Sequence, residues 1–233
     1  MSIDNSINLR NDIIFKAVFG YEKNEKLLIS LLNSILGLEG NDKIINLTFL
    51  NAFNIQEYLN DKLTSLDVKV EDGNGTRYDV EMQVESEKPY INRIIYYHDK
   101  LYTGQLKESE GYEKLSRAIS ISVLNFVLIE NEENFHNIYR YLNIDSKKEL
   151  TDLKEIHFIE LPKFKKKKPE ELKSKFEKWV FALKCGEIYA ENIGEIPEEL
   201  KDEEIVMALN EMVKASEDDV IREILDMRDK ARH

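Results

Sequence analysis

Two alternating runs of residues separated by a turn constrain this chain more than any other feature. Residues 63–85 read LTSLDVKVEDGNGTRYDVEMQVE, with apolar side chains at every second position on both sides of a cluster of Asp, Gly and Asn. A period of two is typical of β-strands, and the cluster supplies residues that tolerate positive φ angles. The pattern therefore predicts a β-hairpin with its turn at 72–75.

The length of the turn decides which side chains face each other across the hairpin. A two-residue loop would set Asp67 opposite Val80, which places a carboxylate against an apolar face. A three-residue loop over 73–75 would shift the pairing by one residue and set Asp67 opposite Glu81. Because three-residue hairpin loops with a Gly bulge are common, we expect the odd-numbered loop or an equivalent bulge.

In this register the hairpin has one apolar and one polar face. The apolar face would carry Leu66, Val68, Val70, Tyr78, Val80, Met82 and Val84. The polar face would carry Asp67, Lys69, Glu81 and Gln83 within a small area. Opposed carboxylates repel each other unless positive charge lies between them, so a divalent cation held by oxygen ligands is one interpretation. The alternative, which the pattern alone favours, is the solvated outer face of an antiparallel sheet.

The hairpin residues resemble the PD-(D/E)XK nuclease superfamily. Asp67, followed after thirteen residues by Glu81, Met82 and Gln83, is similar to the active-site signature of that superfamily. The similarity is greatest to its branch of recombination-promoting nucleases and transposases, and it covers about residues 10 to 185. Other segments that resemble this branch are 11–20 (NDIIFKAVFG), 31–36 (LLNSIL), 93–105 and 178–179.

The resemblance implies a restriction-endonuclease-like core and a metal-dependent DNA endonuclease. Asp67 and Glu81 would bind Mg²⁺ or Mn²⁺, helped by the main-chain carbonyl of Met82, and the metal would activate water for attack on a phosphodiester. The superfamily usually has Lys where this chain has Gln83, which supplies hydrogen bonds but no positive charge. Lys69, on the same face as Asp67, could supply that charge, and the alternative is a solvated strand lysine.

Two groups of side chains are candidates for contacts with DNA phosphates. A helix expected over 90–108 would present Arg93, Tyr97, Lys100 and Gln105 beside the carboxylates, although its tyrosines could equally pack on the sheet. The basic run KFKKKK offers Lys163, Lys165 and Lys166, and the alternative for this run is a solvated loop.

Periodicity in the rest of the chain predicts an α/β (α+β) fold with a mixed central sheet flanked by helices. Helices are expected over 11–19, 24–36, 90–108, 170–184 and, as an acidic pair, 196–232. Strands are expected over 43–50, 117–129 and 155–161, with a strand or helical turn near 135–142. We expect a nuclease-like domain over 1–185 and an acidic helical extension over 186–233.

The charge distribution bears on the partners of the chain. A net charge of −12 argues against a protein that coats DNA non-specifically. Much of this acidity lies in residues 169–233, which hold 18 acidic and 10 basic residues. No apolar run reaches the length of a membrane span. The single cysteine, Cys185, indicates a reducing, cytoplasmic location and reads as a structural thiol at the end of a helix.

Two functional hypotheses follow from these features. The first is a Mg²⁺-dependent hydrolase that cuts DNA phosphodiester bonds, linked to recombination or mobile elements. The second is a nuclease-fold module that binds DNA or protein without catalysis, a hypothesis favoured by Gln83 in place of Lys and by the acidic composition. In either case the acidic C-terminal helices could form a homodimer interface.

Overall fold

The computed structural model describes residues 8–51, 67–86, 88–190 and 192–232. The chain divides into two compact units. The sheet unit comprises residues 45–51 and 67–164. The helical unit comprises, among the described residues, 8–44 and 165–232.

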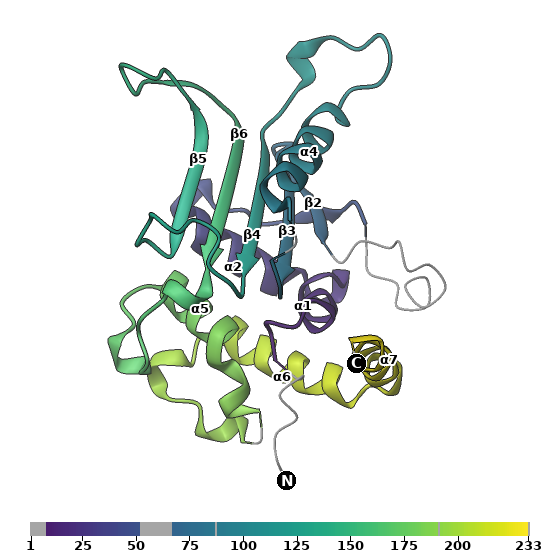
Figure 1. Ribbon diagram of the computed structural model, residues 1–233, viewed down its shortest axis with the longest axis vertical. Helices are drawn as coiled ribbons and strands as arrows, with labels where there is room; N and C mark the ends of the chain where they lie inside the picture. Colours follow the sequence, from purple (N-terminus) through teal and green to yellow (C-terminus); the bar gives the residue numbers. More distant parts are fainter. Residues whose placement is uncertain (1–7, 52–66, 87, 191, 233) are drawn as a thin grey trace. The chain divides into compact units, whose positions relative to one another are not determined.

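The sheet unit contains six strands in the order β1-β2-β3-β4-β6-β5 (Figure 1). Their bounds are β1 Leu47–Phe49, β2 Val68–Asp72, β3 Arg77–Gln83, β4 Ala118–Leu124, β5 His136–Leu142 and β6 Glu149–Glu160. β1, β2 and β3 are antiparallel neighbours, β3, β4 and β6 are parallel, and β5 is antiparallel to β6. Because parallel strands need a crossover, the chain passes from β3 to β4 through α4 (Tyr90–Thr103), which lies along one face of the sheet.

The buried side of α4 fixes the helix on the sheet. Its buried residues recur at helical spacing and are Tyr90, Ile94, His98 and Leu101. The ring of Tyr90 packs edge-on against Phe126, with centroids 5.9 Å apart, and lies 6.5 Å from Phe158. Further along the helix, His98 Nδ1 is 2.9 Å from Ser120 Oγ of β4. The first turn of α4 is therefore held beside the end of β3.

The helical unit contains five α-helices among its described residues. They are α1 Asp12–Phe19, α2 Glu25–Leu36, α5 Lys175–Cys185, α6 Glu203–Glu217 and α7 Asp219–Arg232. Their core centres on Trp179, which is fully buried, lies 5.8 Å from the ring of Phe19 and donates to Ser30 Oγ at 3.2 Å. Throughout the described part of the chain, no helix combines the length and apolar character needed to cross a bilayer.

The fold-class prediction of a mixed sheet with helices and C-terminal helices is confirmed. Several element bounds differ from the expectation: β4 ends at Leu124 rather than 129, β6 begins at Glu149 rather than 155, α5 begins at Lys175 rather than 170, and α6 begins at Glu203 rather than 196. Two further differences have local reasons. The strand expected over 43–50 shortens to 47–49, because the side chain of Asn33 binds both main-chain groups of Ile44. The helix expected over 90–108 ends at Thr103, before Gly104. The stretch near 135–142 is strand β5, and the domain boundary at residue 186 stays a prediction.

Candidate active site

The hairpin of β2 and β3 has the register that a three-residue loop requires. Lys69 pairs with Asp79 across the two strands. The loop contains Gly75 at φ +79°, a value that only glycine adopts without strain. The odd-numbered loop is therefore confirmed, and extending the register by one step sets Asp67 opposite Glu81.

Both faces of the hairpin are covered. Buried apolar side chains on one face are Val68, Val70, Tyr78, Val80 and Met82, and Leu66 lies outside the described residues. On the polar face, Asp67 and Asp79 are only 8% and 7% exposed. The alternative of a solvated outer face is therefore wrong, because α4 lies along this face of the sheet.

Lys69 lies between two of the buried carboxylates. Its Nζ is 2.6 Å from Asp67 Oδ2 and 3.9 Å from Asp79 Oδ2. Burial alone would lower the pKa of Lys69, but the charges of Asp79 and Asp67 outweigh burial and leave that pKa raised. Lys69 is therefore a paired and partly buried cation rather than a solvated strand lysine.

Asp79 joins this cluster, although the sequence did not single it out. Burial raises the pKa of its carboxyl well above the usual range, and the adjacent charge of Asp67 adds to the effect. Its Oδ1 atom is buried and accepts no hydrogen bond from the described residues. Asp79 stands two residues before Glu81 in β3 and so shares its face, but the alternating pattern did not reveal that this face is buried.

Glu81 is held by three hydrogen bonds. Its Oε1 accepts from Tyr90 Oη at 2.5 Å and from Ser122 Oγ at 3.1 Å, and its Oε2 accepts from Gln83 Nε2 at 2.8 Å. Burial outweighs these bonds and raises the pKa of Glu81. Since a carboxylate offers about four acceptor sites, Oε2 keeps capacity for a further ligand. Met82, which lies between Glu81 and Gln83, turns its side chain to the opposite, buried face.

Two of the α4 residues expected beside the carboxylates are found there. Arg93 Nη2 lies 4.0 Å from Glu81 Oε2, and its guanidinium stacks 5.0 Å from the ring centroid of Tyr90. The ring of Tyr97 lies 5.9 Å from Lys69 Nζ. These side chains place one cation and one aromatic ring at the edge of the cluster.

The other two candidates, Lys100 and Gln105, come later in the sequence and make their contacts with other residues. Lys100 Nζ is placed over the ring of Tyr96, 4.6 Å from its centroid. Gln105 follows the end of α4, and its amide bonds both main-chain groups of Ser116, at 3.0 Å and 2.8 Å. Gln105 therefore holds together the two ends of the segment that connects α4 to β4.

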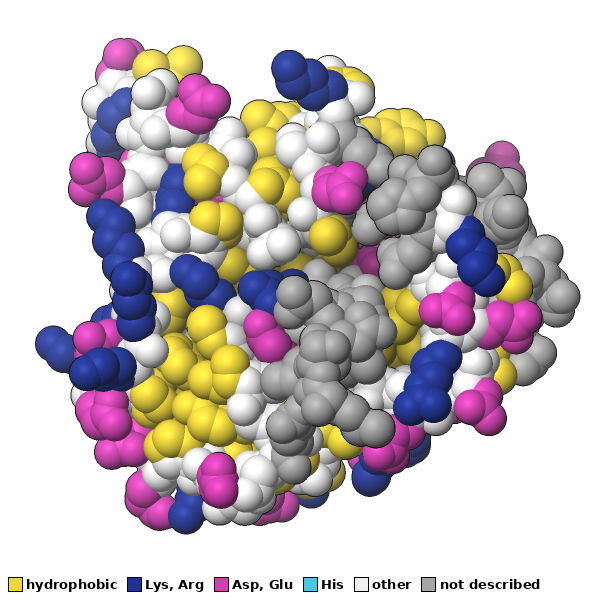
Figure 2. Space-filling model, turned by 60° about the horizontal axis from the view of Figure 1, so that its bottom comes forward, with side chains coloured by type: hydrophobic (Ala, Val, Ile, Leu, Met, Phe, Trp, Pro, Cys, Tyr) yellow, Lys and Arg dark blue, Asp and Glu magenta, His cyan; other side chains and the backbone are white. Residues whose placement is uncertain are grey.

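The basic run is divided between the two units. Lys163 belongs to the sheet unit, where its Nζ lies 2.7 Å from Glu160 Oε2. Lys165 is exposed and Lys166 pairs with Glu177 at 2.5 Å, both in the helical unit. On the face drawn in Figure 2, Asp and Glu side chains lie among the Lys and Arg side chains.

Sequence reasoning missed the two hydroxyl donors to Glu81. Tyr90 directly follows Pro89, and no sequence signal linked it to the carboxylates. For Ser122 a signal existed, because Ser120 and Ser122 stand two apart in an otherwise apolar strand and so share one face. The parallel register of β3 and β4 then sets Ser122 beside Glu81.

A mixed sheet whose central hairpin carries buried carboxylates is the architecture that the nuclease resemblance implied. Residues 9–233 match the family model described as PD-(D/E)XK nuclease family transposase, and the chain belongs to that family. The match extends past residue 185 and takes in the C-terminal helices. Neither the comparison with curated proteins nor that with solved structures found a match.

Proposed function

We propose that this protein is a metal-dependent DNA endonuclease that hydrolyses phosphodiester bonds at the polar face of the β2–β3 hairpin. The observation that carries the proposal is the gathering of Asp67, Asp79 and Glu81 beside Lys69 on the face of the hairpin along which α4 lies, with Asp67 and Asp79 buried. Like charges are costly in such a place unless they serve a positively charged ligand. Membership of a nuclease family related to transposases supports DNA as the substrate and a role in recombination or mobile elements.

The donor set suits a hard divalent cation such as Mg²⁺ or Mn²⁺. Asp67 and Glu81 would hold it through carboxylate oxygens, with the main-chain carbonyl of Met82, and it would supply Lewis-acid activation of water and phosphate. Among the described residues, no three His, Cys, Asp or Glu side chains form a complete metal site. The proposal therefore rests on the pair Asp67 and Glu81, since Mg²⁺ typically takes one or two protein carboxylates and completes its shell with water and substrate phosphate.

The remaining residues of the site position and balance charge. Tyr90, Ser122 and Gln83 hold Glu81 in one orientation. Gln83 cannot supply the positive charge of the usual lysine, so Lys69 would stabilise the negative charge that develops on the attacked phosphate. Arg93, at the edge of the cluster, would contact a phosphate of the bound strand.

The test of this proposal is cleavage of supercoiled plasmid and linear duplex by the purified protein. Nicked or linear product in Mg²⁺ or Mn²⁺, and none in EDTA, supports the endonuclease. The second candidate function, a binding module without catalysis, is favoured by the placement of Gln83 on Glu81. It would show metal-independent DNA binding and no product in any metal.

Replacing Lys69 with Met is expected to lower the cleavage rate about 100-fold, because the site loses the cation that lies between Asp67 and Asp79. Affinity for Mn²⁺ is expected to hold or rise, since no cation then competes for Asp67. Lys69→Arg keeps the charge and should recover part of the rate. The control is Lys107→Met, at an exposed position. A wild-type cleavage rate in the Lys69→Met variant would show that Lys69 has no part in the mechanism.

Replacing Tyr90 with Phe is expected to weaken Mn²⁺ binding about ten-fold, because partners that orient a ligand typically contribute this much. The ring packing against Phe126 and Phe158 is kept, so the fold is preserved. Calorimetric titration measures the effect, with Tyr96→Phe on the exposed side of the same helix as the matched control. Equal affinities in the two variants would show that Tyr90 does not position Glu81.

We also propose that the acidic helical extension over 186–233 contributes a homodimer interface and that the protein acts in the cytoplasm. On α7, the exposed apolar side chain of Met227 is available for such a contact. Light scattering over a range of concentrations tests the dimer, and a constant monomer mass at high concentration would contradict it.

A further inference from the structure

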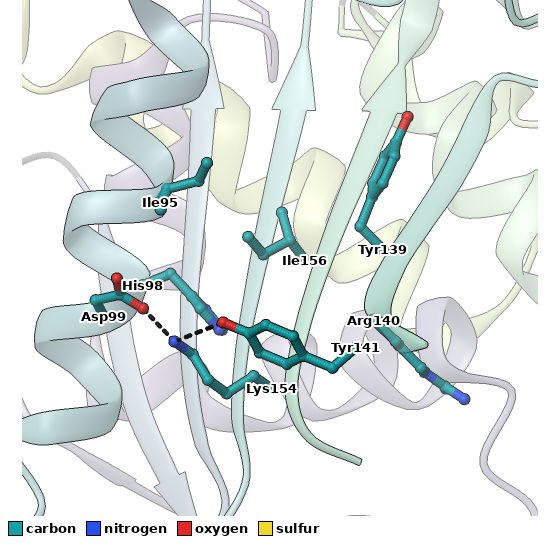
Figure 3. A pocket seen from close by; sticks show the side chains of 8 residues that line it. All are labelled: Ile95, His98, Asp99, Tyr139, Arg140, Tyr141, Lys154 and Ile156. Atoms are coloured by element: carbon teal, nitrogen blue, oxygen red, sulfur yellow. Dashed lines mark hydrogen bonds and ion pairs between the residues drawn. The ribbon is translucent and has the colours of Figure 1, made fainter. Parts of the chain in front are cut away.

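A cavity of about 210 Å³ opens in the sheet unit between α4 and the strands β5 and β6. Ile95 and His98 of α4 line one side, Tyr139 and Tyr141 of β5 line the other, and Ile156 and Lys154 of β6 lie between them (Figure 3). Through the parallel strand register, Ile156 pairs with Ser120 and Ser120 with Asp79. The cavity therefore opens on the same face of the sheet as the candidate active site, with α4 between the two.

The walls of this cavity form a slot for a flat ring. Ile95 presents an exposed aliphatic side chain toward the slot, and Tyr139 and Tyr141 present aromatic rings from the facing strand. Tyr139 is held edge-on by Phe158, with centroids 5.7 Å apart, so this wall is ordered before any ligand enters. Planar bases gain free energy by stacking on such rings regardless of their sequence.

The polar groups of the slot lie at one end. Lys154 pairs with Asp99, and its Nζ is 3.4 Å from Tyr141 Oη. The side chain of Arg140 points away from the slot and pairs with Glu155 (Figure 3). Of the two cations that line the slot, Lys154 is therefore the one directed into it, held by Tyr141 and Asp99.

His98 adds a buried hydrogen-bonding atom to the helix side of the slot. Its Nδ1 is engaged by Ser120 Oγ, whereas its Nε2 has no hydrogen-bond partner among the described residues. Burial and the charge of Lys154 lower the pKa of His98 to about 4, so the ring is neutral near pH 7. His98 therefore gives the helix side of the slot a neutral polar ring rather than a charged one.

We propose that this slot binds one nucleotide, with its base between Ile95 and the two tyrosines and its phosphate at Lys154. The proposal deepens the endonuclease function and rests on it, since a nucleotide unstacked from the substrate strand is the nearest source of this chemistry. A free mononucleotide offers the same base and phosphate, and the test separates the two sources.

The slot can be filled by one substitution that has a matched control. Ile95→Trp puts an indole into the slot, whereas Ile91→Trp puts it one turn earlier on α4, at a position of similar exposure (44% against 48%) that does not line the cavity. The probes are a single-stranded oligonucleotide carrying one 2-aminopurine and the 2-aminopurine mononucleotide. Both are titrated in Ca²⁺ while 2-aminopurine fluorescence is followed.

The wild-type protein and Ile91→Trp are expected to quench the probe, because the base stacks on tyrosine. Ile95→Trp is expected to bind about ten-fold more weakly and to abolish quenching. Quenching of the oligonucleotide assigns the slot to the DNA strand, and quenching of the mononucleotide alone assigns it to a free nucleotide.

Absence of quenching by the wild-type protein with either probe would overturn the proposal, as would wild-type binding by Ile95→Trp. Plasmid cleavage by the same set of variants separates this result from the endonuclease proposal. Cleavage without Ile95-dependent quenching would refute only the proposal of a nucleotide slot. Ile95-dependent quenching without any cleavage would refute only the endonuclease proposal.

Discussion

Replacing Asp67 with Asn, or Glu81 with Gln, is expected to lower metal-dependent DNA cleavage by at least about 1000-fold, the loss that follows when several kcal/mol of metal-mediated stabilisation is removed. Each change keeps the size of the side chain and removes the negative charge that would hold the cation. The measurement is the initial rate of plasmid nicking in Mg²⁺ and in Mn²⁺.

These two variants should fold as well as the wild type. Asp67 and Asp79 are like charges on one buried face, and Asp67 contributes to the raised pKa of Asp79. Neutralising Asp67 relieves that repulsion and leaves Asp79 as the carboxylate partner of Lys69, so circular dichroism and thermal unfolding should show little loss. Asp145→Asn, in an exposed turn, is the matched control and should cleave normally. Undiminished cleavage by an Asp67→Asn/Glu81→Gln double variant would refute the proposed site.

Replacing Glu160 with Gln is expected to reduce the free energy of unfolding by about 3 kcal/mol, because it leaves the buried charge of Lys163 without its partner. Glu160 is fully buried, and Lys163 Nζ lies 2.7 Å from its Oε2. Glu160 Oε1 also accepts hydrogen bonds from the main-chain N–H groups of Leu128 and Ile129, at 2.6 Å and 3.0 Å. This carboxylate therefore fastens the segment after β4 to the end of β6.

The effect is measured by urea denaturation followed through the fluorescence and circular dichroism of the whole chain. Glu110→Gln, which breaks an exposed pair with Lys114 in the same unit, should leave the transition near that of the wild type. If Glu160→Gln and Glu110→Gln unfold at the same urea concentration, the buried pair does not stabilise the sheet unit. The result also tests the assignment of Lys163, whose charge pairs with Glu160 rather than with a DNA phosphate.

Local patterns were sufficient for much of the fold. The alternating runs on either side of 73–75 predicted the hairpin, its faces and its register, because a one-residue error would have buried a carboxylate against an apolar face. Helical periodicity predicted α1 and α2 within a residue or two. A side-chain contact explains one miss: Asn33 binds the main chain of Ile44 and takes it out of the expected first strand.

The candidate site was predictable only in part. The pair Asp67 and Glu81 followed from the hairpin and from the family resemblance. The burial of their face did not, because it depends on how α4 packs back against the sheet. Tyr90 and Ser122 come to Glu81 from a helix and from a parallel strand, and such pairings join residues distant in sequence. The role of Asp79 was not predictable either, because it depends on the burial of that face by α4.

Calorimetric titration of Mn²⁺ into the wild-type protein and Asp67→Asn tests the central claim most directly, that the carboxylates of the hairpin hold a divalent cation. Each titration is repeated with a phosphorothioate DNA duplex that resists cleavage, so that substrate phosphate can complete the site. We expect saturable binding by the wild type, retained in Asp145→Asn and weakened at least about ten-fold in Asp67→Asn. Equal binding by all three proteins, or no binding by the wild type even with the duplex present, would contradict the claim.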